Sequence, residues 1–290
     1  MPNQLKTLFL LGVLSALLVA IGGAIGPRSL NVFLAIAVLM NVGAYFFSDQ
    51  IVLRMSGARV IDERQAPALF AMVRELTERG GLPMPKLAVV PDPNPNAFAT
   101  GRSPGRAVVA VTEGLLHLTD PRELRGVIAH ELGHVAHRDT LIASIAAAGA
   151  TAISYIAHAL QWGAMFGGMR SDDDDGGSVA GGLLMAFLAP VAAVMLQAGI
   201  SRSREYLADD YAAKLTGDPE SLASALAKLQ RHGERLLQRG GPAPAPATAS
   251  LSIVNPLSGR SVFRLFASHP PIEERIARLM AMAHGGIGRA

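Results

Sequence analysis

The chain has 290 residues and a formal net charge of +3; half of it is hydrophobic and only 17% is charged, against about a quarter in soluble domains, which indicates membrane segments. No basic run carries interleaved aromatic residues, so nucleic-acid binding is not expected. The complete absence of cysteine excludes disulfides, cysteine-ligated metal and a thiol nucleophile.

Four stretches without any Asp, Glu, Lys or Arg interrupt the chain, at residues 7–27, 29–48, 140–169 and 176–201. About 20 apolar residues in a helix cross the ~30 Å core of a bilayer, so each stretch is long enough to span it. The first could instead be a cleaved signal peptide, but it exceeds the ~7–15 apolar residues of such a segment. We therefore predict a retained two-span hairpin at 1–48 and two further spans at 140–201.

Basic residues near the spans predict how the chain is oriented. Arg54, Arg59 and Arg64 closely follow the second stretch, whereas the loop after the third carries one arginine and the aspartate run 172–175. Lys and Arg favour the cytoplasmic side and acidic residues count for little. We therefore expect both termini and the segments 49–139 and 202–290 to face the cytoplasm. The aspartate run lacks the alternating ligands of a calcium loop and is expected to be a solvated loop.

The segment 49–139 contains both helix and strand signals. A helix is predicted at 65–79, ended by two glycines. Residues 86–90 and 107–111 are predicted as short strands, with 96–100 as an irregular or edge strand between them in the chain. The run Asp120-Pro121-Arg122-Glu123 is typical of a helix start, because it supplies a cap, a first-turn proline and a capping-box glutamate. That helix is expected to continue to His137.

The segment 202–290 reads as helices separated by a linker. Asp218-Pro219 starts a helix that should end near Gly240. Residues 241–250, rich in Pro and Ala, are predicted as a flexible linker. A last helix should follow Pro270-Pro271 and run to about Ala283.

The run His130-Glu131-Leu132-Gly133-His134 lies on the helix that Asp120 starts. Residues four apart share one face of a helix, so the two imidazoles can converge on one tetrahedral Zn2+. Bound zinc lowers the pKa of a water to ~7, and Glu131 beside it is the predicted catalytic base. The alternative, two histidines on a polar helix face, remains open because the pattern also arises by chance.

A catalytic zinc site needs a third protein ligand and one open position. Position 140 is a threonine rather than a third histidine, so this ligand must come from elsewhere. Glu205 is the best candidate, because it follows the fourth apolar stretch as closely as His134 precedes the third. Antiparallel spans would bring both to the same membrane surface. A surface carboxylate is the alternative reading of Glu205.

Four motifs resemble the signatures of the HtpX family of bacterial heat-shock membrane proteases, which is related to the CAAX prenyl endopeptidases. They are His130 to His134, Asn96-Ala97-Phe98-Ala99-Thr100-Gly101, Ser203-Arg204-Glu205-Tyr206 with Asp209, and Ser268-His269-Pro270-Pro271. The resemblance implies a mainly α membrane protein with four transmembrane helices and a cytoplasmic gluzincin-type α+β metalloprotease domain with a small sheet. It also implies Glu205 as third ligand and quality control of misfolded membrane proteins at the bacterial inner membrane. The aspartate loop and the Pro/Ala linker do not belong to the family pattern.

Further site residues are predicted from their positions. Asp139 and Asp209 could orient the two histidines, or be simple surface acids. Residues Asn96, Ala97, Phe98 and Ala99 could pair with the backbone of a polypeptide substrate, or form an ordinary turn. His269 or Arg204 could stabilise the oxyanion; for His269 the alternative is a helix cap.

Two other functions fit the sequence less well than proteolysis. A non-catalytic membrane scaffold would close its zinc with four protein ligands, and no fourth is evident. A transporter or channel would need ionisable residues within the spans, where only His158 is present. The sequence thus predicts a membrane zinc endopeptidase.

Overall fold

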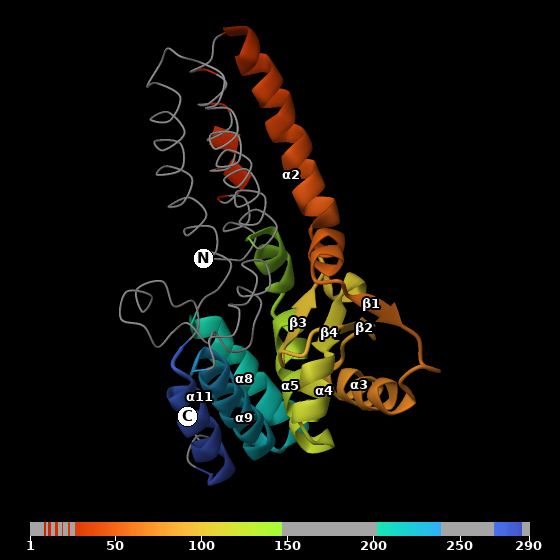
Figure 1. The fold of residues 1–290 in the computed structure, drawn as a ribbon, viewed down its shortest axis with the longest axis vertical. Helices are drawn as coiled ribbons and strands as arrows, with labels where there is room; N and C mark the ends of the chain where they lie inside the picture. Colours follow the sequence, from red (N-terminus) through yellow and green to blue (C-terminus); the bar gives the residue numbers. More distant parts are fainter. Residues whose placement is uncertain are drawn as a thin grey trace.

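The computed structural model describes residues 27–146, 202–238 and 270–285, together with isolated positions between 9 and 23. There, a small sheet and a group of helices form a body from which one long helix projects (Figure 1). The helices are α2 (Pro27–Met55), α3 (Pro67–Gly80), α4 (Glu113–Leu118), α5 (Pro121–Ala136), α8 (Arg202–Thr216), α9 (Pro219–Gln238) and α11 (Ile272–Ala283). The strands are β1 (Arg59–Ile61), β2 (Lys86–Val90), β3 (Ala97–Thr100) and β4 (Val108–Thr112), and a short 3-10 helix occupies Pro104–Arg106.

Helix α2 is the projecting helix, and its surface is apolar. Its part Leu30–Met55 is the one helix among the described residues that is long and apolar enough to cross a membrane. Only 6% of its apolar window is buried, unlike a core helix. Its 29 residues extend about 43 Å at ~1.5 Å per residue, more than the ~30 Å of a hydrocarbon core. The helix therefore continues past the predicted boundary at residue 48, to Met55.

The two N-terminal apolar stretches lie side by side where the structure describes them. The described positions between 9 and 23 are helical, and Asn41 Nδ2 donates to Ser15 Oγ over 2.6 Å. This contact agrees with the predicted hairpin. The third and fourth predicted spans lie outside the described residues beyond 146, as do the aspartate run 172–175 and the linker 241–250. The prediction of four spans therefore stays a prediction.

The sheet has the strand order β1-β2-β4-β3 and mixes both directions. β2 and β4 pair in parallel, whereas β1 and β3 are antiparallel to their neighbours. Alternate residues face opposite sides. Ala97, Ala99 and Val109 join the main core with α3 and α5, while Phe98 and Ala110 pack against Val52 near the end of α2. β3 is thus an edge strand, as predicted, and it lies next to α5.

Helix α5 begins and ends through local hydrogen bonds. At its start Asp120 and Glu123 form the predicted capping box. At its end the Asp139 amide donates to His134 O over 2.9 Å, and the Arg138 amide donates to Val135 O over 3.1 Å. This is a Schellman ending with Arg138 in the left-handed region, at φ 56°. The reversal folds Asp139 back toward the last turn of α5.

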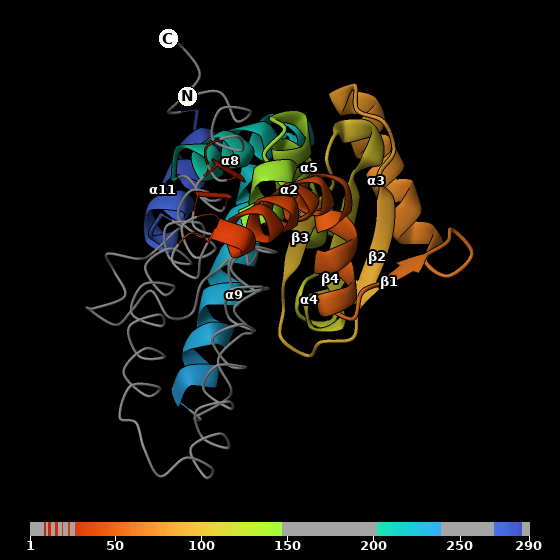
Figure 2. The same ribbon diagram turned by 90° about the horizontal axis from the view of Figure 1, so that it is seen from above.

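Glycine lets α8 approach α5 closely. A β-carbon at Gly133 would lie 3.0 Å from Ala208 Cα and 3.2 Å from Ala208 Cβ, tighter than nine in ten contacts of real β-carbons. Ala208 is fully buried in this interface. Seen from above, α5 lies between the sheet and the group formed by α8, α9 and α11 (Figure 2). The absence of a side chain at Gly133 therefore sets the distance between the two helices that carry the site.

Most predicted elements are confirmed with small shifts. The helix expected at 65–79 is α3, which starts at the proline of Pro67–Gly80. The strand expected at 107–111 is Val108–Thr112, and the last helix ends at Ala283 as predicted. β1 and α4 were not predicted, since three and six residues are too short to show a clear period.

Candidate metal centre

His130 and His134 lie one turn apart on α5 and point to a common position. Their Nε2 atoms are 3.2 Å apart, and the rings meet edge to face with centroids 4.8 Å apart. His130 is buried, whereas His134 is partly exposed. The helical spacing that the sequence predicts thus directs both imidazoles to one point.

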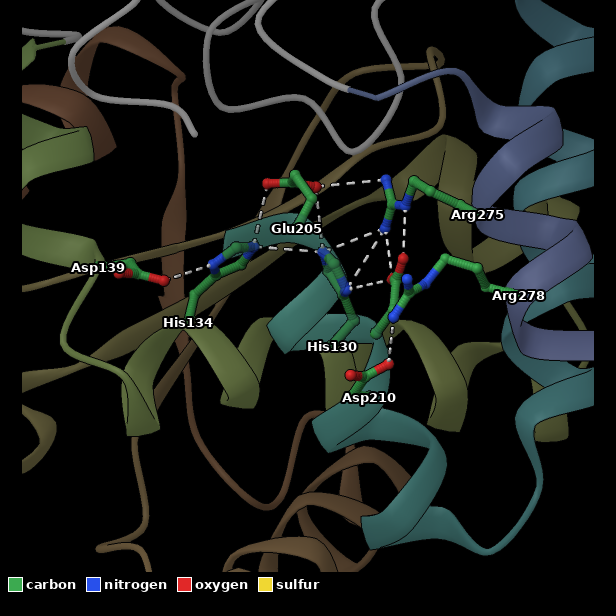
Figure 3. A network of polar contacts seen from close by, with 8 residues as sticks. His130, His134, Asp139, Glu205, Asp210, Arg275 and Arg278 are labelled. Carbon is green, nitrogen blue, oxygen red and sulfur yellow. Dashed lines mark hydrogen bonds and ion pairs between the residues drawn. The ribbon is translucent and has the colours of Figure 1, made fainter. Parts of the chain in front are cut away.

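Glu205 on α8 is the third member of this cluster, 71 positions beyond His134 in the chain. Its Oε1 lies 3.5 Å from His134 Nε2, and its Oε2 lies 3.7 Å from His130 Nε2. The three residues offer ligand atoms that all lie within 4.8 Å of one another. Figure 3 shows the carboxylate facing both imidazoles. The structure therefore brings together the three residues that the sequence singled out as ligands.

The spacing and chemistry of these atoms fit a metal ion. Tetrahedral ligands at ~2.0–2.2 Å from an ion lie roughly 3.3–3.6 Å from each other. The 3.2 Å between the two Nε2 atoms, and the 3.5 and 3.7 Å from the two Glu205 oxygens to their nearer imidazoles, are close to that spacing. Two imidazole nitrogens and one carboxylate are also the donors that divalent transition metals accept.

Each histidine is contacted on its other nitrogen by an aspartate. His130 Nδ1 lies 2.9 Å from Asp209 Oδ1, and His134 Nδ1 lies 3.2 Å from Asp139 Oδ2. If each Nδ1–H donates to its carboxylate, both Nε2 lone pairs point at one position, where one metal ion can bind both. Asp139 and Asp209 are buried, so they are not the surface acids of the alternative reading.

The cluster as a whole has an excess of negative charge. Its carboxylates are Glu131, Asp139, Glu205 and Asp209, and its guanidiniums are Arg204 and Arg275. Four acids against two bases leave two uncompensated negative charges when all are ionised, which a divalent cation neutralises. Burial would lower the pKa of His134, but the bond to Asp139 and the charges of Glu205 and Glu131 raise it to about 9. The site thus favours positive charge even at an imidazole.

Glu131 is buried between the two histidines and strand β3. Burial raises the pKa of its carboxyl, against the opposing effect of both imidazoles. The backbone of Ala99 hydrogen-bonds the same carboxylate. Glu131 therefore connects the metal ligands to the edge strand.

The predicted substrate strand occupies the end of the sheet beside this carboxylate. Residues 97–100 form β3 and pair with β4 in the register Ala97↔Val111 to Thr100↔Val108. The Asn96 amide donates to Thr112 Oγ1 over 2.8 Å, so Asn96 extends the pairing. The ordinary-turn reading is therefore wrong for 97–100; the role in substrate binding stays a prediction.

The two proposed oxyanion donors have different positions. Arg204 is buried, and its Nη1 lies 3.5 Å from Asp139 Oδ1. His269 lies outside the described residues, next to Pro270. Neither placement tests the predicted role.

Arg275 on α11 is a member of the cluster that the sequence reading missed. It is fully buried and forms an ion pair with Asp209 over 2.7 Å. The signal was present, since Arg275 falls on the side of the last helix that also carries Ile272 and Leu279. A charged residue within such an apolar row indicates a buried partner.

Comparisons with known proteins agree with this geometry. The model of peptidase family M48 matches residues 63–283. A "Protease HtpX homolog" from Syntrophobacter fumaroxidans is 50% identical over 285 residues, covering 97% of this chain and 100% of that protein. Another from Thermococcus kodakarensis is 48% identical over 280 residues, covering 96% of each.

A solved structure, Ste24p of S. mikatae, is 19% identical with a TM-score of 0.46, covering 83% of this chain and 56% of that one. The resemblance that the four motifs carry is thus confirmed by relatives that match almost the whole chain. The chain belongs to peptidase family M48 and is a metallopeptidase similar over nearly its full length to the HtpX proteases.

Proposed function

We propose that this chain is a zinc-dependent endopeptidase of the bacterial inner membrane that cleaves misfolded or damaged membrane proteins. The convergence of His130, His134 and Glu205 beside a buried Glu131 is the observation that carries the proposal. Three protein ligands leave a fourth position open, which is typical of catalytic rather than structural zinc. This argues against the non-catalytic scaffold, in which Glu131 would have no task.

The metal ligands and the base divide the chemistry. When bound, zinc supplies a Lewis acid and a water whose pKa is lowered to ~7. The His130 and His134 Nε2 atoms and a Glu205 oxygen would hold it. Glu131 takes the proton of the attacking water and returns it to the leaving amine. Burial favours this role, because a carboxyl with a raised pKa transfers protons more readily near neutral pH.

Strand β3 is suited to hold the substrate. Its outer edge has no strand partner among the described residues, so an extended peptide can add to it by backbone hydrogen bonds. Because Ala99 contacts Glu131, a peptide on this edge runs beside the base. We propose that residues 96–99 align the scissile bond in this way, and that Arg204 or His269 stabilises the oxyanion.

The membrane context supports the substrate class. Val52, in the last turns of α2, packs on the sheet, so an apolar helix of membrane-spanning length enters the body next to the proposed substrate edge. We propose four transmembrane helices and a gluzincin-type domain divided between 49–139 and 202–290, with both parts in the cytoplasm. Unfolded membrane or cytosolic segments near the surface would reach β3 from there.

Substitution of Glu131 by Gln tests the catalytic proposal. The change keeps shape and removes the base, so zinc content should stay near one per chain while cleavage of casein by the detergent-purified protein falls by about 10³-fold or more. A chelator should abolish wild-type cleavage, and added zinc should restore it. Glu78→Gln on α3, an exposed position away from the site, is the matched control and should cleave normally. Near-normal cleavage by Glu131→Gln would rule out Glu131 as the base, whereas wild-type protein that binds zinc but cleaves nothing would favour the scaffold.

A further inference from the structure

Arg275 is the largest fully buried side chain in the described part of the chain. It comes from α11, the last described helix, and lies 145 positions from His130 in the sequence. A buried guanidinium is tolerated only where carboxylates and acceptors satisfy it. Its guanidinium contacts Asp209, His130 and Glu205, which all belong to the metal centre and lie on other helices.

Its strongest contact is a two-point bond to Asp209. Arg275 Nε donates to Asp209 Oδ2 over 2.8 Å, and Nη2 donates to Oδ1 over 2.7 Å. This bidentate arrangement fixes the plane of the carboxylate as well as its position. The same Oδ1 lies 2.9 Å from His130 Nδ1. Arg275 thus determines where the acceptor for the His130 Nδ1–H lies, and hence which way the Nε2 lone pair points.

A second contact reaches the carboxylate ligand directly. Arg275 Nη1 lies 3.3 Å from Glu205 Oε2, while Oε1 lies 3.5 Å from His134 Nε2. The guanidinium therefore engages Oε2, which also lies 3.7 Å from His130 Nε2, while Oε1 is turned toward His134. Such an arrangement favours a carboxylate that offers one oxygen to the metal. Figure 3 shows Arg275 extending from α11 toward both Glu205 and His130.

We propose that Arg275 is a positioning residue: from α11 it holds the carboxylates of both Asp209 and Glu205 in the orientation that zinc binding needs. The inference rests on the proposed zinc site and adds to it a residue from the C-terminal helix. The direction of the effect of Arg275 on zinc affinity can also be checked. The positive charge of Arg275 repels a divalent cation, so the charge alone weakens zinc binding. The proposal requires its orienting effect to outweigh that repulsion.

Zinc affinity of the full-length protein in detergent distinguishes the two effects. Arg275→Gln removes both the positive charge and the planar guanidinium that forms the two-point bond to Asp209. We therefore expect zinc to bind about 10–100-fold more weakly, as for other residues that orient metal ligands. Arg275→Lys keeps the charge but cannot form the planar fork, so it should restore little of the affinity. The dissociation constant is measured by competition with a chromophoric chelator.

Arg278 provides the matched control on the same helix. It also pairs with an aspartate of α8, Asp210, over 3.4 Å, and its guanidinium covers the Tyr206 ring at 4.6 Å. Its side chain is 40% exposed, and the residues that it contacts, Asp210 and Tyr206, are not among the residues of the metal centre. Arg278→Gln removes a comparable bond between α8 and α11, and its zinc affinity should equal that of the wild type.

Two measurements separate positioning from a general loss of stability. The visible spectrum of the cobalt-substituted protein reports ligand geometry, and at saturating cobalt it should differ between Arg275→Gln and wild type. The double variant Asp209→Asn with Arg275→Gln should bind zinc no more weakly than the worse single variant, because the two residues act as one unit. The double variant also removes the buried charge of Asp209 that Arg275→Gln leaves without its guanidinium, so it is the one to use if Arg275→Gln does not fold.

The outcomes keep this inference apart from the proposed function. Wild-type protein that binds no zinc would overturn both. Wild-type protein that binds zinc, with Arg275→Gln binding equally or more tightly, would overturn the positioning role alone. Full recovery by Arg275→Lys, or additive effects in the double variant, would also contradict it.

Discussion

Each histidine of the site is supported by an aspartate, and each aspartate by an arginine. His130 contacts Asp209, which in turn pairs with Arg275. His134 contacts Asp139, whose Oδ1 lies at a longer distance, 3.5 Å, from Arg204 Nη1. In both cases the histidine is on α5 and the arginine is on another helix. Orientation of the imidazoles is therefore a tertiary property and does not follow from helical spacing alone.

Glu205 allows the sharpest test at this scale. Glu205→Ala removes a proposed ligand, so zinc affinity should fall by more than the ~10–100-fold expected for a residue that only orients ligands. Asp209→Asn should fall within that smaller range. The control is Asp210→Asn, which is adjacent in sequence but faces Arg278, and it should bind zinc normally. Metal analysis after dialysis against chelator provides the comparison, and full zinc retention in Glu205→Ala would remove that residue from the ligand set.

At the scale of elements, local chemistry explains what the sequence predicted. The capping box at Asp120 and the prolines before α11 act within one turn, so these helix starts are visible in the sequence. The pairing of Glu205 with the two histidines was predicted because two apolar stretches separate them symmetrically. Arg275 was missed because its partners lie on other helices and no spacing rule connects them. β1 was missed because its three residues depend on pairing with β2 for their structure.

The close contact between α5 and α8 leads to a prediction for Gly133. Alanine would gain up to ~1 kcal/mol of helix propensity, but its β-carbon would meet Ala208 at 3.0 and 3.2 Å. Overpacking of this kind costs about 1–3 kcal/mol, so we expect Gly133→Ala to lower the unfolding temperature and weaken zinc binding by displacing Glu205. Gly43→Ala in α2, where nothing lies within 4 Å, gains the same helix propensity without the clash, so it should not lower the unfolding temperature and should leave zinc affinity unchanged. A higher unfolding temperature with unchanged zinc affinity would show that α8 is not held by this contact.

The whole molecule is proposed to keep its catalytic body on the cytoplasmic side. Cysteine at position 178, in the predicted outer loop, should react with an impermeant thiol reagent in intact cells. Cysteine at the exposed Glu234 of α9 should react only after the membrane is opened. The absence of native cysteine makes this labelling unambiguous. The reverse pattern would place the site outside the cytoplasm and change the substrate class to exported proteins.

The metal centre joins two parts of the chain that synthesis produces far apart in time. His134 and Glu205 enclose roughly 70 residues, and an ion held by both acts as a cross-link that offsets the entropy of closing so long a loop. The ion therefore also fastens the two ends of the segment predicted to cross the membrane. The ribosome must complete that segment before the proposed ligand set exists. We therefore predict that a nascent chain of this protein stays inert as a protease until synthesis has passed both predicted spans and reached Glu205.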